Sequence, residues 1–182
     1  RQVGKTTLLE ICAEKNRQYV TLDDLDARSL AQNDPALFIQ TYKTPLIIDE
    51  VQYAPQLFSY IKIAVDREKE DKKKNGMFWL TGSQKFHLMK GITESLAGRV
   101  AIVDLLGLSN AEISGQAKIE PFVPNLDWIE SARNRVKKPK QLDEVYQQIW
   151  QGSFPRVNID KKESTRQRFY SSYIQTYLQR DV

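Results

Sequence analysis

Cysteine and histidine are almost absent: Cys12 and His87 are the only residues of their types among 182. A single cysteine excludes an internal disulfide, and together the two residues supply too few ligands for a zinc site. No apolar run approaches the roughly 20 residues needed to cross a bilayer, and no signal-peptide pattern opens the chain. We therefore expect a soluble, cytoplasmic protein with no membrane partner.

The charge is balanced in one part of the chain and basic in the other. Residues 1–113 carry 15 Lys/Arg and 15 Asp/Glu, whereas residues 114–182 carry 12 and 8, which accounts for the net charge of +4. A mildly basic segment is compatible with nucleic acid as a partner without identifying one. With 41% hydrophobic residues, the chain has enough apolar side chains to form a core.

The spacing of apolar residues predicts alternating helices and strands. Helices are expected over residues 4–15, 36–42 and 57–70, and strands over 19–22, 46–48, 77–80 and 100–106. This alternation predicts an α/β fold with a largely parallel sheet flanked by helices. Residues 114–140 contain three prolines and favour a connector with a short helix near Trp128, and helices resume at 141–151 and 163–179. We therefore expect a core over 1–113, followed by a connector and a helical lid over 114–182.

The chain opens on residues typical of a phosphate-binding loop. Gly4-Lys5-Thr6 matches the end of the pattern G-x-x-x-x-G-K-[ST], whose first glycine would lie two residues before Arg1. Backbone amides from Gly4 to Thr7 would point at the phosphates from a helix N-terminus. Lys5 would reach the β- and γ-phosphates of ATP, and the Thr6 hydroxyl would ligate Mg²⁺. By itself the tripeptide is weak evidence, because it arises by chance in many proteins.

An acidic pair supplies the second motif. The apolar run Leu46–Ile48 ends in Asp49 and Glu50. Asp49 is expected to hold the hydration shell of Mg²⁺, and Glu50 to orient and polarise the attacking water. The alternative is a strand that ends in acidic turn residues. Two motifs in the right order on the right elements favour the interpretation as a P-loop NTPase.

Polar residues after the 77–80 strand form the third motif. Ser83 or Gln84 is a candidate sensor of the γ-phosphate, and the alternative is a strand-to-helix turn with Ser83 as an N-cap. Arg99 is a candidate arginine finger or sensor, because a guanidinium can neutralise charge on the transferred phosphate. For Arg99 the alternative is an exposed arginine before a strand. Arg180 is a weaker candidate for the same role.

Six segments follow one another along the chain: residues 1–9 (RQVGKTTLL), 47–52 (IIDEVQ), 80–84 (LTGSQ), 95–100 (SLAGRV), 152–155 (GSFP) and 177–182 (YLQRDV). Together they resemble the bacterial and archaeal AAA-family ATP-binding proteins whose ATPase core precedes a C-terminal domain of unknown function. The resemblance implies that the Leu80 strand lies between the phosphate-loop strand and the Asp49 strand. It also implies that residues 152–155, with Pro155, belong to a helical lid near the adenine. In that family a nuclease-like region follows, so we expect this chain to be a fragment truncated at both ends.

Three functions remain open at this stage. The first is Mg²⁺-dependent ATP hydrolysis that acts as a nucleotide-driven switch. The second is a scaffold that holds ATP or ADP without turnover, and the third is a DNA-associated ATPase. Self-association is a further candidate interaction, because a neighbouring subunit could complete such a site.

Overall fold

The computed structural model describes residues 2–72, 75–82, 92, 95–115, 121–135, 140–160 and 162–178. Backbone contacts divide the chain into two compact units, Val3–Asp104 and Leu105–Val182. Ser83 and Gln84, the candidate sensors, and Arg180, the weaker arginine candidate, lie outside the described residues. The boundary expected between residues 113 and 114 stays a prediction.

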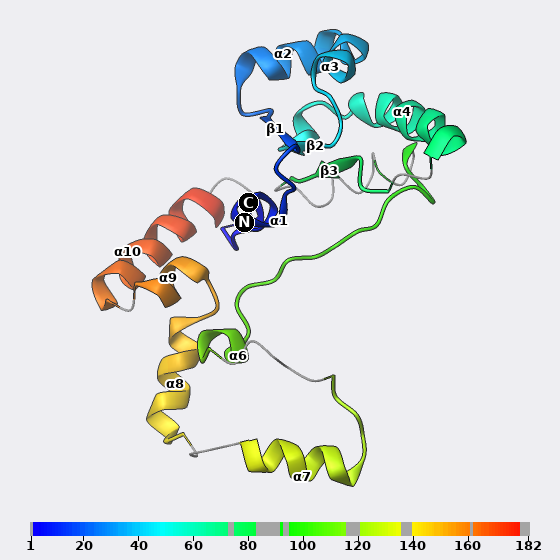
Figure 1. Cartoon of the computed structure of the whole chain (residues 1–182). Helices are drawn as coiled ribbons and strands as arrows, with labels where there is room; N and C mark the ends of the chain where they lie inside the picture. Colours follow the sequence, from blue (N-terminus) through cyan, green and yellow to red (C-terminus); the bar gives the residue numbers. More distant parts are fainter. Residues whose placement is uncertain are drawn as a thin grey trace. The chain divides into compact units, whose positions relative to one another are not determined.

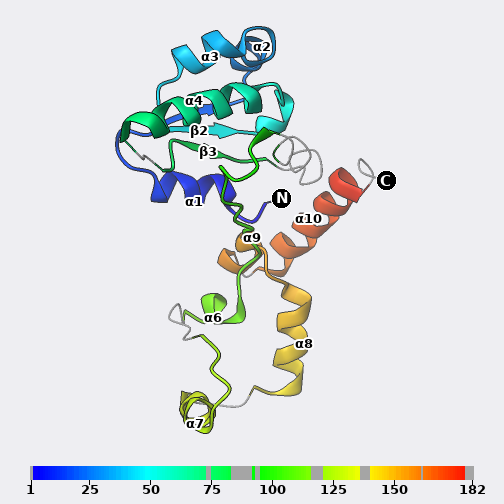
Figure 2. The same cartoon turned by 90° about the vertical axis from the view of Figure 1, so that its right-hand side faces the viewer.

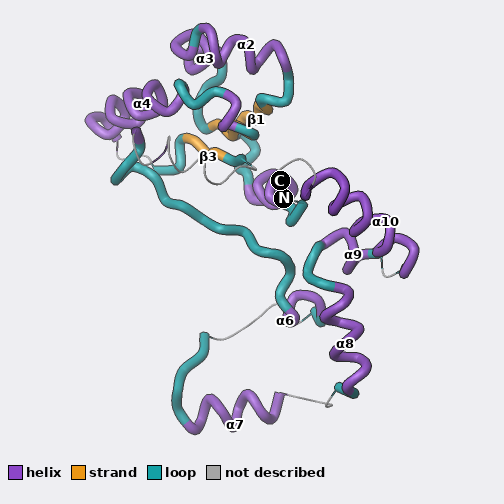
Figure 3. The backbone as a smooth tube through the Cα atoms, turned by 180° about the vertical axis from the view of Figure 1, so that it is seen from behind, coloured by secondary structure: helices purple, strands orange, loops and turns teal. Residues whose placement is uncertain are grey.

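The first unit is an α/β unit with a small parallel sheet (Figures 1 and 3). Its elements, in chain order, are α1 (Lys5–Cys12), β1 (Gln18–Thr21), α2 (Leu25–Asn33), α3 (Pro35–Thr41), β2 (Leu46–Asp49), the 3₁₀ helix η1 (Val51–Tyr53), α4 (Leu57–Lys72) and β3 (Phe78–Leu80). The described strands lie in the order β1-β2-β3, and both pairings are parallel. The expected α/β class with a parallel sheet is confirmed for this unit.

Strand β2 is the central strand of the described sheet, and its first three residues are apolar. All four of its residues are buried, whereas the three residues of β3 are only half-buried. In the described sheet β3 has a partner on one side alone, which agrees with its partial burial. The Leu80 strand does lie beside the Asp49 strand, as the resemblance implied.

The main core lies between the sheet and helices α2, α3 and α4. Leu46 and Ile48 point into this core together with Val20, Phe38 and Phe58. Ile47 is equally buried, at 2% exposure, but lies outside that cluster because successive side chains alternate across a strand. Figure 2 shows α4 on one side of the sheet and α1 on the other. Asp49 lies two residues after Ile47 on β2, so its side chain is on the same side of the sheet, which is the α1 side.

Local capping explains where the two helices between β1 and β2 begin. The Asp24 carboxylate accepts a hydrogen bond from the Ala27 amide at 2.8 Å at the start of α2. The Asp34 carboxylate accepts one from the Leu37 amide at 2.9 Å at the start of α3, where Pro35 occupies the first turn. A side-chain oxygen that satisfies a free amide, and a proline that needs no partner, are both typical of helix N-termini.

The expected strand over residues 100–106 is not a strand. The whole segment is described, and it runs as an irregular chain with no strand paired to it among the described residues. Val103 is 88% exposed and Leu106 is 78% exposed. Apolar composition gave the wrong prediction because a strand also needs a neighbouring backbone that satisfies its amides and carbonyls.

The second unit is helical in its described part. Its elements are α6 (Asn110–Ile113), α7 (Leu126–Arg135), α8 (Leu142–Gln151), α9 (Pro155–Ile159), α10 (Glu163–Tyr173) and the π-helix η2 (Ile174–Leu178). An aromatic cluster packs α10 against the start of α9: Phe154 lies 5.1 Å from Phe169 and 5.1 Å from Tyr173 between ring centroids. No described helix is both long and apolar enough to cross a membrane.

Candidate functional site

The site begins at the N-terminus of α1. Gly4 precedes the helix in the left-handed region, with φ 89° and ψ 24°, and Lys5 is the first helical residue. A Cβ built on Gly4 would meet no atom within 4 Å, so the backbone conformation, not crowding, favours glycine there. The first amides of a helix have no intrahelical acceptor and carry the positive end of its dipole. The start of α1 therefore offers amide donors to an anion.

The first turn of α1 contacts the ends of two strands. The Lys5 ammonium donates a hydrogen bond to the Gly82 carbonyl at 3.2 Å, just after β3. The Thr6 hydroxyl donates to Oδ2 of Asp49 at 3.2 Å, at the end of β2. These contacts join residues that lie 77 and 43 positions apart in the sequence. The structure thus brings Lys5, Thr6 and Asp49 together at the carboxyl edge of the sheet.

Asp49 is the centre of this cluster. It is 8% exposed, and among the described residues three donors bind its carboxylate. Thr6 and the Tyr19 hydroxyl both donate to Oδ2, the latter at 2.9 Å, and the Glu50 amide donates to Oδ1 at 3.0 Å. A buried carboxylate is costly unless such donors compensate for the lost water. The three donors therefore fix this carboxylate in one orientation.

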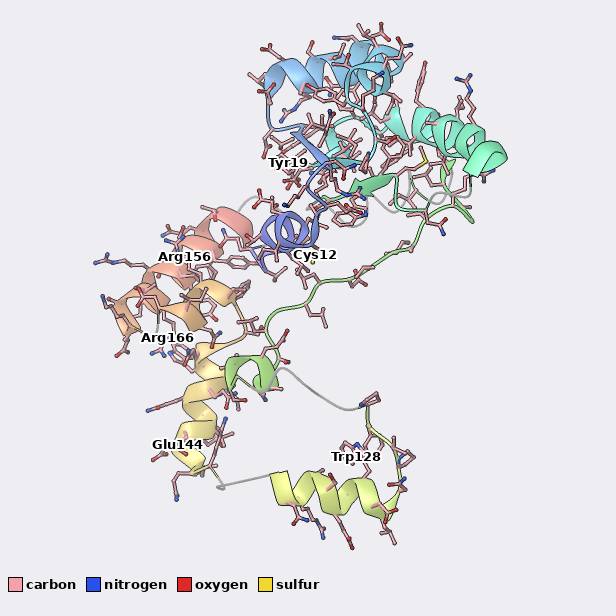
Figure 4. The ribbon with its side chains drawn as sticks, in the orientation of Figure 1. Cys12, Tyr19, Trp128, Glu144, Arg156 and Arg166 are labelled. Carbon is pink, nitrogen blue, oxygen red and sulfur yellow. The ribbon has the colours of Figure 1, made fainter. Side chains whose placement is uncertain are left out.

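Tyr19 is a member of the cluster that the sequence did not reveal. It lies on β1, where Figure 4 labels it, and pairs in register with Ile47. Burial raises the pKa of the Tyr19 phenol to about 12, and the hydrogen bond to Asp49 contributes in the same direction. The hydroxyl therefore remains protonated, as a donor, at any ordinary pH. The alternation of side chains along a strand could have indicated this contact. With Tyr19 paired to Ile47, the side chains of residues 19 and 49 lie on the same side of the sheet.

Glu50 follows Asp49 in an uncommon backbone conformation. Its φ of 54° and ψ of 41° place it in the left-handed region, at the junction of β2 and η1. Non-glycine residues rarely adopt this conformation, and they do so most often at functional sites. The Gln52 amide donates a hydrogen bond to the Glu50 carboxylate. Directly after Glu50 the Val51 amide donates a hydrogen bond to the Thr81 carbonyl at 3.0 Å, and the chain continues as η1.

Thr81 directly follows β3, near the same cluster. It is 6% exposed, and its amide donates to the Ile48 carbonyl at 3.1 Å. Within the part of the chain that the structure describes, its buried hydroxyl has no hydrogen-bond partner. Position 81 follows the Ile48–Leu80 pair in register and so lies next to Asp49 on the neighbouring strand. An unsatisfied buried hydroxyl at a polar sheet edge suits a site that takes a polar ligand.

The oxygens of this cluster fit a magnesium ion. Mg²⁺ prefers oxygen ligands, keeps several waters and is usually held by few protein groups together with phosphate. The Thr6 hydroxyl and the Asp49 carboxylate supply oxygens at one point. Among the described residues, no group of three or more His, Cys, Asp or Glu side chains forms a separate metal site.

The other predicted residues are not joined to this cluster by any described contact. Thr7 lies on α1 with an exposed side chain. Arg99 forms an ion pair with Asp66 at 2.7 Å on the surface, and the hydrogen bond to Asp66 raises the Arg99 pKa. Pro155 opens α9 in the second unit.

Comparisons with known proteins identify a family for the first part of the chain. The model of a family described as an AAA domain matches residues 1–114, more than half of the chain. An uncharacterized protein of Mycobacterium bovis and one of Mycobacterium tuberculosis are each 36% identical over 120 residues, 64% of this chain and 26% of the relative. The match thus spans about a quarter of the length of each relative. No solved structure matches the chain significantly.

Proposed function

Since the chain belongs to the AAA domain family, we propose that it binds ATP with Mg²⁺ at the Lys5–Thr6–Asp49 cluster and hydrolyses the nucleotide. The main support for this proposal is the 3.2 Å hydrogen bond from the Thr6 hydroxyl to Asp49. It links the first turn of a helix to the acidic end of a buried strand, where P-loop NTPases place their phosphate and metal ligands.

Each residue of the cluster has a chemical role in this proposal. The amides at the start of α1 cradle the phosphates, and Lys5 turns from the Gly82 carbonyl to the β- and γ-phosphate oxygens. Thr6 holds Mg²⁺ through its hydroxyl oxygen, and Asp49 binds the ion's water shell. The ion itself would neutralise charge on the β- and γ-phosphates. Thr7, at the same helix end, contributes its amide, and Pro155 belongs to the lid over the adenine.

Hydrolysis needs a group that orients water, and Glu50 is the candidate. Its carboxylate would accept a hydrogen bond from the water whose oxygen attacks the γ-phosphorus. The bond from phosphorus to the bridging oxygen then breaks, so ADP leaves with that oxygen and inorganic phosphate carries the water oxygen. Ser83 or Gln84 as sensor and Arg99 as arginine finger remain part of the proposal. For Arg99 this requires release from Asp66.

A second candidate function is nucleotide binding without turnover, as a scaffold. The Gln52 amide donates to the Glu50 carboxylate and occupies a group that hydrolysis would need. A nucleotide-driven switch and a scaffold share the same binding step, so turnover distinguishes them. The DNA-associated ATPase rests on the basic excess in residues 114–182 and on the nuclease-like region that the resemblance implies. Self-association likewise stays a proposal.

Binding is tested with a fluorescent ATP analogue in Mg²⁺ buffer. Lys5→Ala removes a charged hydrogen bond worth about 1.5–3 kcal/mol, so we expect affinity to fall by roughly 10- to 100-fold. Lys15→Ala is the matched control, because Lys15 is exposed just beyond α1. Equal affinity in Lys5→Ala and the unmodified protein would place the nucleotide elsewhere.

Hydrolysis is tested by phosphate release. We expect Glu50→Gln to bind the analogue normally and to lower turnover by about 100-fold or more, the usual contribution of a positioned base. Glu10→Gln, an exposed glutamate on α1, is the control. Binding without turnover in the unmodified protein would support the scaffold, and equal turnover in Glu50→Gln would remove Glu50 from the mechanism.

A further inference from the structure

Two hydroxyl groups from different elements donate to the same oxygen of Asp49. Thr6 reaches Oδ2 from α1 at 3.2 Å, and Tyr19 reaches it from β1 at 2.9 Å. Thr6 belongs to the phosphate-loop pattern, whereas no motif includes Tyr19. Tyr19 is 43% exposed, whereas the Asp49 residue that it contacts is 8% exposed.

We propose that Tyr19 is a positioning residue that sets the orientation of the Asp49 carboxylate for binding the water shell of Mg²⁺. The inference rests on the proposed function, because it concerns the same site. It adds a residue that acts through Asp49 and does not itself touch the nucleotide.

The Asp49 carboxylate has a limited number of positions that can accept hydrogen bonds. An ionised aspartate has about four lone-pair positions, two on each oxygen. Thr6 and Tyr19 use the two positions on Oδ2, and the Glu50 amide uses one on Oδ1. One position, on Oδ1, is left to accept a hydrogen bond from a metal-bound water. Tyr19 thereby determines which oxygen is turned to the ion.

Without the Tyr19 hydroxyl the carboxylate gains freedom. Two donors would remain, one on each oxygen, and the group could rotate about its Cβ–Cγ bond. Groups that orient a metal-binding side chain typically contribute 10- to 100-fold to metal affinity, so the effect should appear in the Mg²⁺ dependence of binding. The Thr6 hydroxyl can bind the ion through its oxygen while its O–H group still donates a hydrogen bond to Asp49. Tyr19 would not bind the ion, so its role is confined to orienting the Asp49 carboxylate.

The test is Tyr19→Phe in the full chain, which keeps the ring and removes one hydroxyl. A fluorescent ATP analogue is titrated at increasing Mg²⁺ concentrations and, separately, in EDTA. We expect the Mg²⁺ concentration for half-maximal binding to rise about 10-fold, with the affinity in EDTA unchanged. Direct Mn²⁺ binding in the presence of ATP, followed by electron paramagnetic resonance, should weaken by the same factor. Tyr60→Phe is the matched control, since Tyr60 is a partly exposed tyrosine on α4, across the sheet.

If Tyr19 had a structural role alone, Tyr19→Phe would change the stability of the protein and not the Mg²⁺ dependence of binding. If Tyr19→Phe lowers the midpoint of urea unfolding but leaves the Mg²⁺ dependence within twofold of the unmodified protein, the inference is overturned. If Tyr19→Phe does not fold, Tyr19→His, which keeps a ring N–H donor, replaces it and should show a smaller rise; no rise would again overturn the inference. Failure of the proposed function appears differently, as an unmodified protein whose binding of the analogue does not depend on Mg²⁺, and it would remove the basis for Tyr19 as well.

Discussion

Arg17 is expected to hold α1, and with it Lys5 and Thr6, against the sheet. No residue of α1 is buried, so the helix has little apolar contact of its own. Arg17 follows the helix with only 3% of its side chain exposed. Its guanidinium donates to the Gly76 carbonyl at 2.9 Å and lies 3.9 Å from the centroid of the Trp79 ring. It also pairs with Glu14 at 2.6 Å.

Arg17→Lys removes the contacts with Gly76 and Trp79 that depend on the planar guanidinium group. A hydrogen bond to a charged donor contributes about 1.5–3 kcal/mol, and a partly desolvated cation over a tryptophan about 0.5–2 kcal/mol. The pair with Glu14 contributes little, since that carboxylate is 57% exposed and solvent screens it. Lysine keeps the charge, but its N–H donors all lie on one nitrogen, and it lacks the flat guanidinium face. We therefore expect the free energy of unfolding to fall by about 2 kcal/mol, roughly a 30-fold change in the folding equilibrium.

Urea denaturation followed by circular dichroism measures this loss, and nucleotide titration measures its consequence for the site. Because Arg17 fixes the chain at the end of α1, affinity for the ATP analogue should fall several-fold as well. Arg67→Lys, an exposed arginine on α4, is the control and should change stability by less than about 0.5 kcal/mol. An Arg17→Lys protein as stable as the unmodified one would refute the reasoning that these contacts anchor α1.

Two further predictions concern the backbone and the protonation of the site. Gly4→Ala should weaken binding of the ATP analogue, because a Cβ in the left-handed conformation costs about 1–2 kcal/mol although no neighbouring atom obstructs it; isothermal calorimetry checks this, and unchanged affinity would show that Gly4 can leave that conformation freely. The Tyr19 pKa is raised from 10.0 to about 12 by folding, so its contribution to stability is full below pH 10 and is lost as pH rises toward 12, because the unfolded state releases the proton first. Absorbance titration at alkaline pH with Tyr19→Phe as reference tests this, and a Tyr19 that titrates near pH 10 would contradict it.

The sequence predicted elements whose signal is local. Leu46–Ile48 is apolar at consecutive positions, as a strand buried on both sides requires, and β2 is buried throughout. Pro35 marked the first turn of α3, which begins at that residue. The phosphate-loop and acidic motifs were recognised for the same reason, because each is a short pattern. Their contact through Thr6 and Asp49 could be expected once both were placed at the carboxyl edge of a parallel sheet.

What the sequence did not predict depends on partners distant in the chain. Residues 100–106 have the composition of a strand but pair with no described strand. Tyr19 was part of a predicted strand, and its contact with Asp49 follows from the register Tyr19–Ile47, which no local pattern specifies. The involvement of Arg99 with Asp66 is similarly a contact across 33 positions. In each case the missing information is which backbone or side chain lies opposite.

The environment of Asp49 explains how this residue can be buried in the fold and still serve the proposed ligand binding. A carboxylate at 8% exposure destabilises a fold unless donors replace its water, and here they come from α1, β1 and the β2–η1 junction. These donors belong to elements that must already be assembled, so the carboxylate is satisfied only when the sheet edge has its final form. The same arrangement leaves one acceptor position on Oδ1. In the proposed site a metal-bound water would therefore be received without rotation of Asp49, which would reduce the entropic cost of binding.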